Sequence, residues 1–297
     1  MKFSIIIPLA PERDCEVKAS LENLDFDKKE YEVIIKVGKN PSLNRNNGAK
    51  ESKGEILCFL DDDAFIENDI LKKAENFFKK YNVDILGGPQ LTPKDDKYFA
   101  KTSGYAISDF FCTSFMSNRY KKGKLNLNAD ENSLTSAICF VKKEVFDKLN
   151  GFNLNLFPGE DPEFFYRAKK QGFKIAYSPE IFIYHRRRPT LKLLWKQFSN
   201  YGYTRVKKER TLSNKINILY LLPSVFLIYL ILLIPLSLIR IFFILPLIIY
   251  ILIILISGIK QIIIYKDLKS IFLLPFIYPL IHVSYGYGLI KGLIKEH

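Results

Sequence analysis

The last third of the chain has almost no charged residues. From Thr211 to the end, the sequence contains only two acids, Asp267 and Glu296, and seven lysines or arginines. Subtracting these from the totals of 31 and 44 leaves 29 acids and 37 bases in residues 1–210, which are therefore expected to form a water-exposed, mildly basic domain. This division excludes a simple soluble enzyme and a disordered chain.

Paired cysteines and nucleic-acid-binding motifs are also missing. No C-x-x-C motif occurs, so the sequence predicts neither a zinc cage nor a disulfide scaffold; the four cysteines are Cys15, Cys58, Cys112 and Cys139. No helix-turn-helix, zinc-finger or RNP pattern accompanies the net charge of +13. We therefore expect the excess basic residues to bind a membrane surface or phosphorylated small molecules, and we expect no nucleic-acid partner.

The N-terminal residues carry neither a dinucleotide fingerprint nor a secretion signal. No G-x-G-x-x-G follows the first apolar run, which argues against a dinucleotide-dependent oxidoreductase. That run, Phe3–Ile7, is too short for the hydrophobic region of a signal peptide, and Pro8 and Glu12 interrupt it. We interpret it as a strand, and we expect residues 1–210 to stay in the cytoplasm.

Residues 3–86 alternate strand and helix patterns, and further strands and helices follow a less regular stretch over residues 87–135. The predicted strands are Phe3–Pro8, Tyr31–Val37, Ile56–Leu60, Val83–Leu86, Ala137–Val141 and Lys174–Tyr177, and the predicted helices cover residues 13–24, 43–52, 68–80, 143–149 and 161–171. Such alternation is typical of an α/β fold of the Rossmann type with a mainly parallel sheet. Ligands of these sheets bind in the crevice at the carboxyl ends of the strands.

Apolar segments dominate the C-terminal part. Residues 216–239 and 241–259 contain no charge, and each can cross a hydrocarbon layer of ~30 Å. Only Arg240 separates them, so they predict a helical hairpin. Because lysines and arginines flank both outer ends, the positive-inside rule places these ends in the cytoplasm.

A third apolar segment covers residues 271–290. It contains Pro275 and Pro279, and it either spans the membrane or forms a re-entrant helix. The predicted division is therefore a cytoplasmic catalytic domain over residues 1–210 and a membrane domain over residues 211–297. A buried core hairpin is the alternative for the apolar segments.

Three consecutive carboxylates, Asp61, Asp62 and Asp63, directly follow the third predicted strand. Their mutual repulsion requires water or a cation. Hard carboxylate oxygens suit Mg²⁺ or Mn²⁺, which commonly bridge to substrate phosphates. A solvated turn before the next helix is the alternative.

Two polar residues lie between the second and third predicted strands. Arg45 offers a planar fork for a phosphate or a base edge, and Asn46 can bond a ribose or the backbone. Gly48 would allow the helix to approach a strand closely. The alternative for Arg45 is an exposed helix position without a ligand.

A second acidic motif, Glu160-Asp161, opens the helix predicted over residues 161–171. Glu163 and Arg167 lie four residues apart and can pair on one face of that helix. Asp161 is then free to point into the cleft and act as general base on an acceptor hydroxyl. An N-capping aspartate without a catalytic role is the alternative.

A run of cations precedes the apolar segments. Arg186, Arg187 and Arg188 can neutralise a pyrophosphate or a lipid phosphate, or they can contact anionic headgroups. His185, directly before them, is either a metal ligand or a structural histidine.

The ordered set of motifs in residues 1–210 resembles family 2 glycosyltransferases of the GT-A fold. It consists of Ser4–Pro8, Arg45-Asn46-x-Gly48, Lys53–Glu55, Phe59–Asp63, Gly159–Asp161 and His185. The resemblance implies that Asp61 and Asp63 form the D-x-D pair, which contacts the sugar nucleotide and holds a metal ion on its diphosphate. It also implies that Asp161, beside Glu160, is the catalytic base. The residues that would line the nucleotide site are Pro8, Glu12, Arg45 and Asn46. Asp62 and Glu160 are also expected to contact the substrate or its nucleotide.

The chain departs from this family in two places. Many members have V-D-D-G-S after the second strand, whereas Ile35–Asn40 stands here, so the donor base is not identified. Processive members carry Q-x-x-R-W, whereas Gln197–Tyr201 lacks the Arg-Trp, which favours the addition of one sugar. The closing motif His282–Gly288 resembles the tails of membrane-bound members that act on polyprenyl-linked sugars.

These features predict a multi-pass membrane glycosyltransferase with its catalytic domain in the cytoplasm. It would transfer one sugar from a nucleotide-diphosphate sugar to a membrane-associated, polyprenyl-linked acceptor. The reaction would depend on Mg²⁺ or Mn²⁺, and the resemblance implies inversion. A nucleotidyltransferase of related fold and a non-catalytic membrane scaffold are the alternatives.

Overall fold

The computed structural model describes residues 1–212 and 218–295. These residues form two compact units, each described here by itself: unit 1 is Met1–Pro93 with Phe115–Arg186, and unit 2 is Lys94–Ser114 with Arg187–His297. The domain limit predicted at residue 210 lies within helix α8 (Leu191–Leu212) of unit 2.

Unit 1 is built on a six-stranded sheet in the order β2-β1-β3-β7-β5-β8. Three neighbouring pairs are parallel, and β7 runs antiparallel to both β3 and β5. The predicted α/β fold with a mainly parallel sheet is therefore confirmed. The strands are β1 (Phe3–Leu9), β2 (Tyr31–Val37), β3 (Ile56–Leu60), β5 (Ile85–Gly87), β7 (Ile138–Lys142) and β8 (Ile175–Tyr177).

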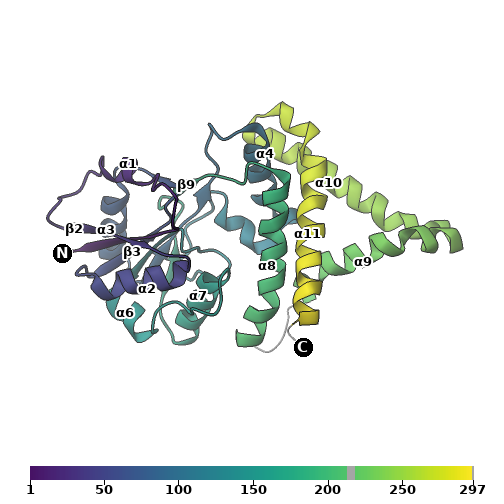
Figure 1. Ribbon diagram of the computed structural model, residues 1–297. Helices are drawn as coiled ribbons and strands as arrows, with labels where there is room; N and C mark the ends of the chain where they lie inside the picture. Colours follow the sequence, from purple (N-terminus) through teal and green to yellow (C-terminus); the bar gives the residue numbers. More distant parts are fainter. Residues whose placement is uncertain (213–217, 296–297) are drawn as a thin grey trace. The chain divides into compact units, whose positions relative to one another are not determined.

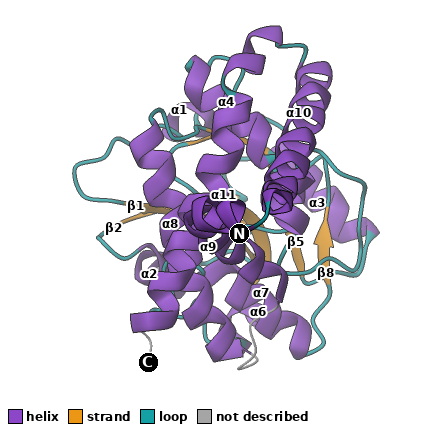
Figure 2. Cartoon of the chain, turned by 90° about the vertical axis from the view of Figure 1, so that its right-hand side faces the viewer, coloured by secondary structure: helices purple, strands orange, loops and turns teal. Residues whose placement is uncertain are grey.

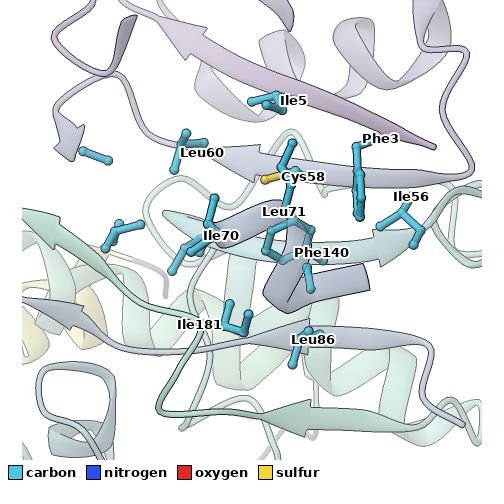
Figure 3. Packing of buried hydrophobic residues seen from close by; sticks show 14 of the residues in the cluster. Phe3, Ile5, Ile56, Cys58, Leu60, Ile70, Leu71, Leu86, Phe140 and Ile181 are labelled. Carbon is cyan, nitrogen blue, oxygen red and sulfur yellow. The ribbon is translucent and has the colours of Figure 1, made fainter. Parts of the chain in front are cut away.

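Two apolar layers cover this sheet. Along β3, Cys58 and Leu60 point into one layer, while Leu57 and Phe59 point into the other. Figure 3 shows the first layer, in which side chains of β1, β3 and β7 meet helix α3 (Ile70–Lys80). Because both faces are covered, β3 is apolar at every position, as the sequence predicted. The second layer packs under α6 (Lys143–Lys148) and α7 (Glu160–Lys170).

Helix α2 (Pro41–Glu51) approaches β1 closely because residue 48 is a glycine. A Cβ atom on Gly48 would lie 2.5 Å from Cγ2 of the buried Ile6. The predicted role of Gly48 is thus confirmed. The close packing carries Arg45, three residues earlier on the same helix, toward the carboxyl ends of the strands.

The helix predicted over residues 13–24 is wrong in extent. Only Lys18–Leu21, a single turn labelled α1, is helical. The preceding residues form turns, since Glu12 has a left-handed φ of 65° and the Val17 amide donates to the Asp62 carbonyl oxygen at 3.1 Å. This hydrogen bond ties the segment after β1 to the aspartate cluster.

A second, three-stranded sheet was not predicted from the sequence. It consists of β4 (Ala64–Ile66), β9 (Ile183–His185) and β6 (Gln90–Leu91), with β9 in the middle. In the antiparallel pairing of β4 with β9, Ala64 faces His185. The small sheet therefore brings His185 beside the residues that precede β4.

Unit 2 is helical. Besides α8 it contains α4 (Tyr98–Ile107), α5 (Phe110–Thr113), α9 (Ile218–Ile239), α10 (Leu245–Tyr265) and α11 (Leu274–Lys295). Helix α11 lies beside α8 and α9 (Figures 1 and 2). Glycines permit this contact, because a Cβ on Gly288 would lie 1.9 Å from the Ser199 carbonyl oxygen and one on Gly202 would lie 2.1 Å from that of Tyr285.

Two helices of the described part are long and apolar enough to cross a membrane. They cover Ile218–Ile239 and Ile241–Tyr265, where a short 3₁₀ turn precedes α10. The second helix thus extends beyond the predicted end at residue 259, and residues 216 and 217 of the first predicted segment lie outside the described residues. The third predicted segment, residues 271–290, is not among these two helices. Its first residues end a 3₁₀ turn (Leu268–Phe272), and α11 starts at Leu274 and continues to Lys295 with Pro279 inside it.

Candidate functional site

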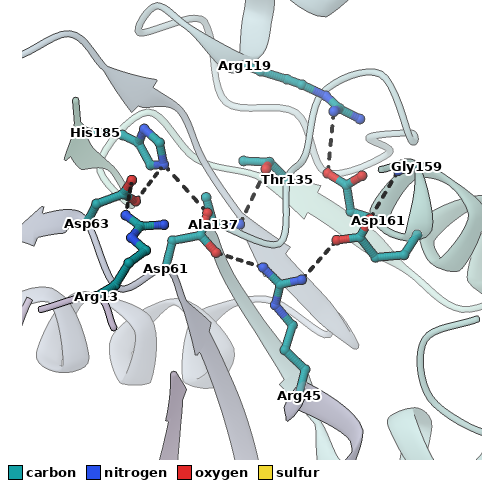
Figure 4. A network of polar contacts seen from close by, with 11 residues as sticks. Arg13, Arg45, Asp61, Asp63, Arg119, Thr135, Ala137, Gly159, Asp161 and His185 are labelled. Carbon is teal, nitrogen blue, oxygen red and sulfur yellow. Dashed lines mark hydrogen bonds and ion pairs between the residues drawn. The ribbon is translucent and has the colours of Figure 1, made fainter. Parts of the chain in front are cut away.

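A network of charged side chains lies where β3 ends in unit 1 (Figure 4). Asp61 directly follows β3, Asp63 precedes β4, and His185 ends β9. The His185 Nε2 atom lies 3.0 Å from Asp63 Oδ1 and 3.6 Å from Asp61 Oδ2. One ligand atom from each of these three residues lies within 4.8 Å of the others, so the three side chains can surround one cation.

The orientation of His185 suits a metal ligand. Its Nδ1 atom lies 3.1 Å from the Arg186 carbonyl oxygen. In the neutral imidazole with the proton on Nδ1, this hydrogen bond leaves the Nε2 lone pair facing the two aspartates. Two carboxylates and one imidazole fit Mn²⁺ or Mg²⁺ in the chemistry of their donor atoms. Of the two readings that the sequence left open for His185, the geometry favours the metal ligand.

The charges of this cluster balance one another. Burial alone would raise the pKa of Asp61, but the hydrogen bond to His185 and the charge of Arg45 lower it. Burial likewise opposes ionisation of Asp63, yet His185 and Arg13 hold its pKa well below the ordinary range. Burial also works against a charged His185, but the carboxylates of Asp63 and Asp61 raise its pKa to about 9. Without a metal ion, His185 is therefore protonated at neutral pH, and a cation bound at Nε2 would have to displace that proton.

Asp62 lies outside the possible metal cluster. Its side chain is buried, and Arg13 Nε lies 3.3 Å from its Oδ2 atom. Burial and the neighbouring Asp63 raise the pKa of Asp62 to about 6. The predicted role of Asp62 in substrate binding stays a prediction.

Arg45 joins the two acidic motifs. Its Nη2 atom donates to Asp61 Oδ1 at 2.7 Å, and its Nη1 atom donates to Glu160 Oε1 at 2.9 Å. Only 4% of its side chain is exposed, so the alternative of an exposed helix residue is excluded. The guanidinium is occupied by two carboxylates of the protein itself, and a contact of Arg45 with the nucleotide stays a prediction.

The other residues predicted to line the nucleotide site are Asn46, Pro8 and Glu12, which differ in burial and in hydrogen bonding. Asn46 makes two hydrogen bonds of 2.9 Å with the backbone of Phe152, one through each end of its amide, and so fixes the loop that leads to α7. Pro8 is buried in β1, and Glu12 is exposed in the turn that follows β1. The predicted binding roles of Pro8, Glu12 and Asn46 stay predictions.

The second acidic motif forms the first turn of α7. Glu160 is buried, and burial together with the adjacent Asp161 carboxylate raises the pKa of Glu160. The N-cap of the helix is Gly159, with a φ of 122°, so Asp161 is not the capping residue. Asp161 Oδ2 instead lies 3.4 Å from Arg119 Nη1. The geometry therefore leaves the Asp161 carboxylate available for chemistry.

Arg119 was not identified from the sequence. It ends a 3₁₀ turn (Ser114–Arg119), and its guanidinium also donates to the carbonyl oxygens of Glu131 and Asn132. Sequence patterns around residue 119 carry no signal for this contact, because the partners come from a loop and from α7. The side chain fixes one oxygen of Asp161.

The three consecutive arginines do not share one environment. Arg186 belongs to unit 1, where its guanidinium lies 5.0 Å from the centre of the Phe65 ring. Arg187 and Arg188 belong to unit 2, in which the Arg187 amide donates to Asp96 Oδ2 at 3.0 Å. The predicted phosphate-binding role of all three stays a prediction.

Comparison with known families identifies the fold and its class. The model of the family described as "Glycosyltransferase like family 2" matches residues 5–202, which is more than half of the chain. The chain belongs to glycosyltransferase family 2. The membership implied by the ordered motifs is thus confirmed.

Two relatives of this family 2 chain match it over different shares of their own length. Glycosyltransferase AglE of Haloferax volcanii is 26% identical over 154 residues, which are 52% of this chain and 47% of AglE. The chain thus spans about half the length of AglE. The dolichyl N-acetyl-alpha-D-glucosaminyl phosphate 3-beta-D-2,3-diacetamido-2,3-dideoxy-beta-D-glucuronosyltransferase of Methanococcus voltae is 26% identical over 99% of this chain and 97% of its own length.

A solved structure shares the fold of this family 2 chain. The mannosyltransferase PcManGT of Pyrobaculum calidifontis superimposes with a TM-score of 0.60 at 11% identity, covering 100% of this chain and 88% of its own. At this identity the likeness concerns the fold alone. Together with the family match, it confirms the predicted GT-A fold.

We expect Arg45→Met to destabilise the protein by about 3–5 kcal/mol, because the buried Glu160 would lose its cation and the partly exposed Asp61 would keep only His185. Adding Glu160→Gln should restore part of this loss. The control is Lys50→Met on the exposed face of the same helix, which should change stability by less than about 0.5 kcal/mol. Denaturant unfolding of the purified protein measures each value. Equal stability of Arg45→Met and Lys50→Met would contradict a bridging role.

Proposed function

We propose that the chain transfers a single sugar from a nucleotide-diphosphate sugar to a hydroxyl group of a membrane-associated, polyprenyl-linked acceptor. The observation that carries this proposal is the network in which Arg45 joins the cluster of Asp61, Asp63 and His185 to the Glu160-Asp161 motif. One guanidinium contacts both acidic motifs, so Asp61 and Glu160 lie within the reach of a single side chain (Figure 4).

The relatives support this choice of substrates. The Methanococcus voltae protein is named for a dolichyl-phosphate-linked sugar acceptor, and its similarity extends over nearly the whole chain. PcManGT was solved with GDP-Man and Mn²⁺. A nucleotide-sugar donor and a lipid-linked acceptor are therefore the substrates that we propose here.

Asp61, Asp63 and His185 would hold Mg²⁺ or Mn²⁺ at the donor. When bound, this ion supplies positive charge to the departing diphosphate. Other residues of the chain hold two of these ligands in place: the Arg186 carbonyl oxygen contacts His185 Nδ1, and Arg45 pairs with Asp61.

Asp161 would serve as the general base. Arg119 holds its Oδ2 atom, while Oδ1 makes no hydrogen bond to the described residues and can accept the proton of the acceptor hydroxyl. The hydroxyl oxygen then bonds to the anomeric carbon, and the electron pair of the broken carbon–oxygen bond leaves with the diphosphate. A single base opposite the leaving group inverts the anomeric centre.

The apolar helices α9 and α10 would anchor the protein in the membrane as a hairpin. Both expose large apolar side chains along their length, such as Ile231, Leu238 and Ile256. Their outer ends carry the basic residues that favour the cytoplasmic side, which is also where nucleotide sugars would reach unit 1. A lipid-linked acceptor and the enzyme would then share one membrane.

A hydrolysis screen tests the class of reaction and the donor together. Purified protein is incubated with UDP-, GDP- and dTDP-sugars in the presence of Mg²⁺ or Mn²⁺, with nucleoside triphosphates in parallel. Release of one nucleoside diphosphate supports the transferase and identifies its donor base. Release of pyrophosphate from a triphosphate would indicate a nucleotidyltransferase instead.

We expect Asp161→Asn to lower turnover by a factor on the order of 10² or more, because the amide cannot accept the proton of the acceptor hydroxyl. Donor affinity should be nearly unchanged, since Asp61, Asp63 and His185 are intact. The control is Asp147→Asn, the same change at an exposed carboxylate on α6. Steady-state kinetics and nucleotide binding measure both quantities, and full activity of Asp161→Asn would refute the base.

Two variants test the metal site without an activity assay. We expect Asp63→Asn and His185→Gln each to weaken Mn²⁺ binding about 100-fold or more, because each removes a ligand rather than a supporting residue. Titration calorimetry with Mn²⁺ alone measures the affinity, and Asp147→Asn again serves as the control. Wild-type affinity in His185→Gln would restrict the site to the carboxylates.

If α9 and α10 span the membrane as a hairpin, the loop between them and their outer ends lie on opposite sides of the membrane. In a Cys15→Ser background, we expect Arg240→Cys to react with an impermeant maleimide only from the outside of the cell. Lys269→Cys, placed after α10, should react only in inverted vesicles. Labelling of both positions from the same side would exclude a membrane-spanning hairpin.

A further inference from the structure

A second arginine, Arg13, reaches the aspartate cluster from the turn after β1 (Figure 4). Its Nη2 atom donates to Asp63 Oδ2 at 2.9 Å, and its Nε atom lies 3.3 Å from Asp62 Oδ2. The Arg13 side chain is 46% exposed, whereas those of Asp62 and Asp63 are 7% and 13% exposed. A half-exposed cation thus neutralises two carboxylates that are nearly buried.

Asp63 is shared between two positive groups. Its Oδ1 atom faces His185 at 3.0 Å, and its Oδ2 atom is held by Arg13. A metal ion bound by Asp61, Asp63 and His185 would therefore meet a guanidinium on one of its ligands. Like charges at this distance repel, so Arg13 and the ion compete for the Asp63 carboxylate.

Arg13 is better able to change partners than the other arginines of this network. Arg45 is buried between Asp61 and Glu160, and Arg119 is held by Asp161 and two backbone carbonyl oxygens. Arg13 instead follows Glu12 in an exposed turn, and its Nη1 atom has no hydrogen bond to the described residues. Rotation of this side chain would break its contacts with Asp62 and Asp63 but no other hydrogen bond of its guanidinium among the described residues.

The fork of the guanidinium matches phosphate as well as carboxylate. An arginine binds two oxygens of either group with parallel hydrogen bonds of similar length. In the proposed reaction the donor brings a diphosphate to the ion at Asp61 and Asp63. If the diphosphate were bound to an ion held by Asp61, Asp63 and His185, the guanidinium paired with Asp63 would lie near it.

We propose that Arg13 binds the diphosphate of the donor. Before the donor and its metal ion are bound, the Arg13 guanidinium pairs with Asp62 and Asp63. The inference depends on the proposed function and adds a residue to its donor site. With a metal ion held by Asp61, Asp63 and His185, the Asp63 carboxylate would be neutralised without Arg13, and the guanidinium would be free to pair with the diphosphate.

One substitution should then change two affinities in opposite directions. We expect Arg13→Gln to bind Mn²⁺ alone about fivefold more tightly, because a competing cation is removed. With Mn²⁺ saturating, it should bind inorganic pyrophosphate about tenfold more weakly, because a charge-assisted hydrogen-bonded pair is lost. Titration calorimetry of the full chain measures both affinities without any sugar transfer.

Two further variants make the result specific. Lys18→Gln removes one positive charge from the exposed face of the neighbouring α1 and should leave both affinities unchanged. Arg13→Lys keeps the charge without the fork, so its pyrophosphate affinity should lie between those of wild type and Arg13→Gln. Matching thermal unfolding curves establish that the variants are folded.

The outcomes separate this inference from the proposed function. If the wild type binds Mn²⁺ and pyrophosphate but Arg13→Gln behaves like Lys18→Gln, the role of Arg13 is refuted and the donor site stands. Tighter Mn²⁺ binding with unchanged pyrophosphate binding also refutes it, since Arg13 would then only compete with the metal. A wild type that binds neither probe would refute the proposed function together with Arg13.

Discussion

The candidate site depends on one buried guanidinium. Asp61 at the end of β3 and Glu160 at the start of α7 are separated by about a hundred residues in sequence, and Arg45 holds both at hydrogen-bond distance. A buried carboxylate such as Glu160 is costly without a cationic partner, so Arg45 stabilises the close approach of the two motifs. The glycine at position 48 supplies the required geometry, because it lets α2 lie close enough to β1 for Arg45 to reach this place.

The small sheet completes the cluster. The third possible ligand, His185, comes from β9, and the pairing of β9 with β4 sets its position by register, with Ala64 opposite His185. A shift of that register by one residue would turn the imidazole to the other face of the small sheet. The metal-binding geometry is therefore a consequence of backbone pairing between two strands of three residues each.

The sequence predicted the elements that carry a clear local pattern of apolar and polar residues. The uninterrupted apolar run of β3, the aspartates that follow it and the acidic start of α7 are all visible in the sequence, because burial on both faces and a change to polar residues leave a signature. The extent of α1 and the small sheet were missed, since their strands and turns are too short for any periodicity. Arg45 was recognised as important, but its burial between two acids depends on a partner from α7 that no spacing indicates.

The arginines of the network differ in how firmly their side chains are held. Arg119 contacts the proposed base, and Arg13 contacts the proposed metal and donor site. Arg119 is nearly buried and bonded to two carbonyl oxygens, so it can hold one oxygen of Asp161 throughout a reaction cycle in which the base must keep its direction. Arg13 is half exposed on a turn and carries its charge to Asp63, where incoming positive charge changes the balance. A movable guanidinium can pair with Asp63 before the donor binds and with the diphosphate afterwards, whereas the buried Arg45 keeps its two carboxylate partners.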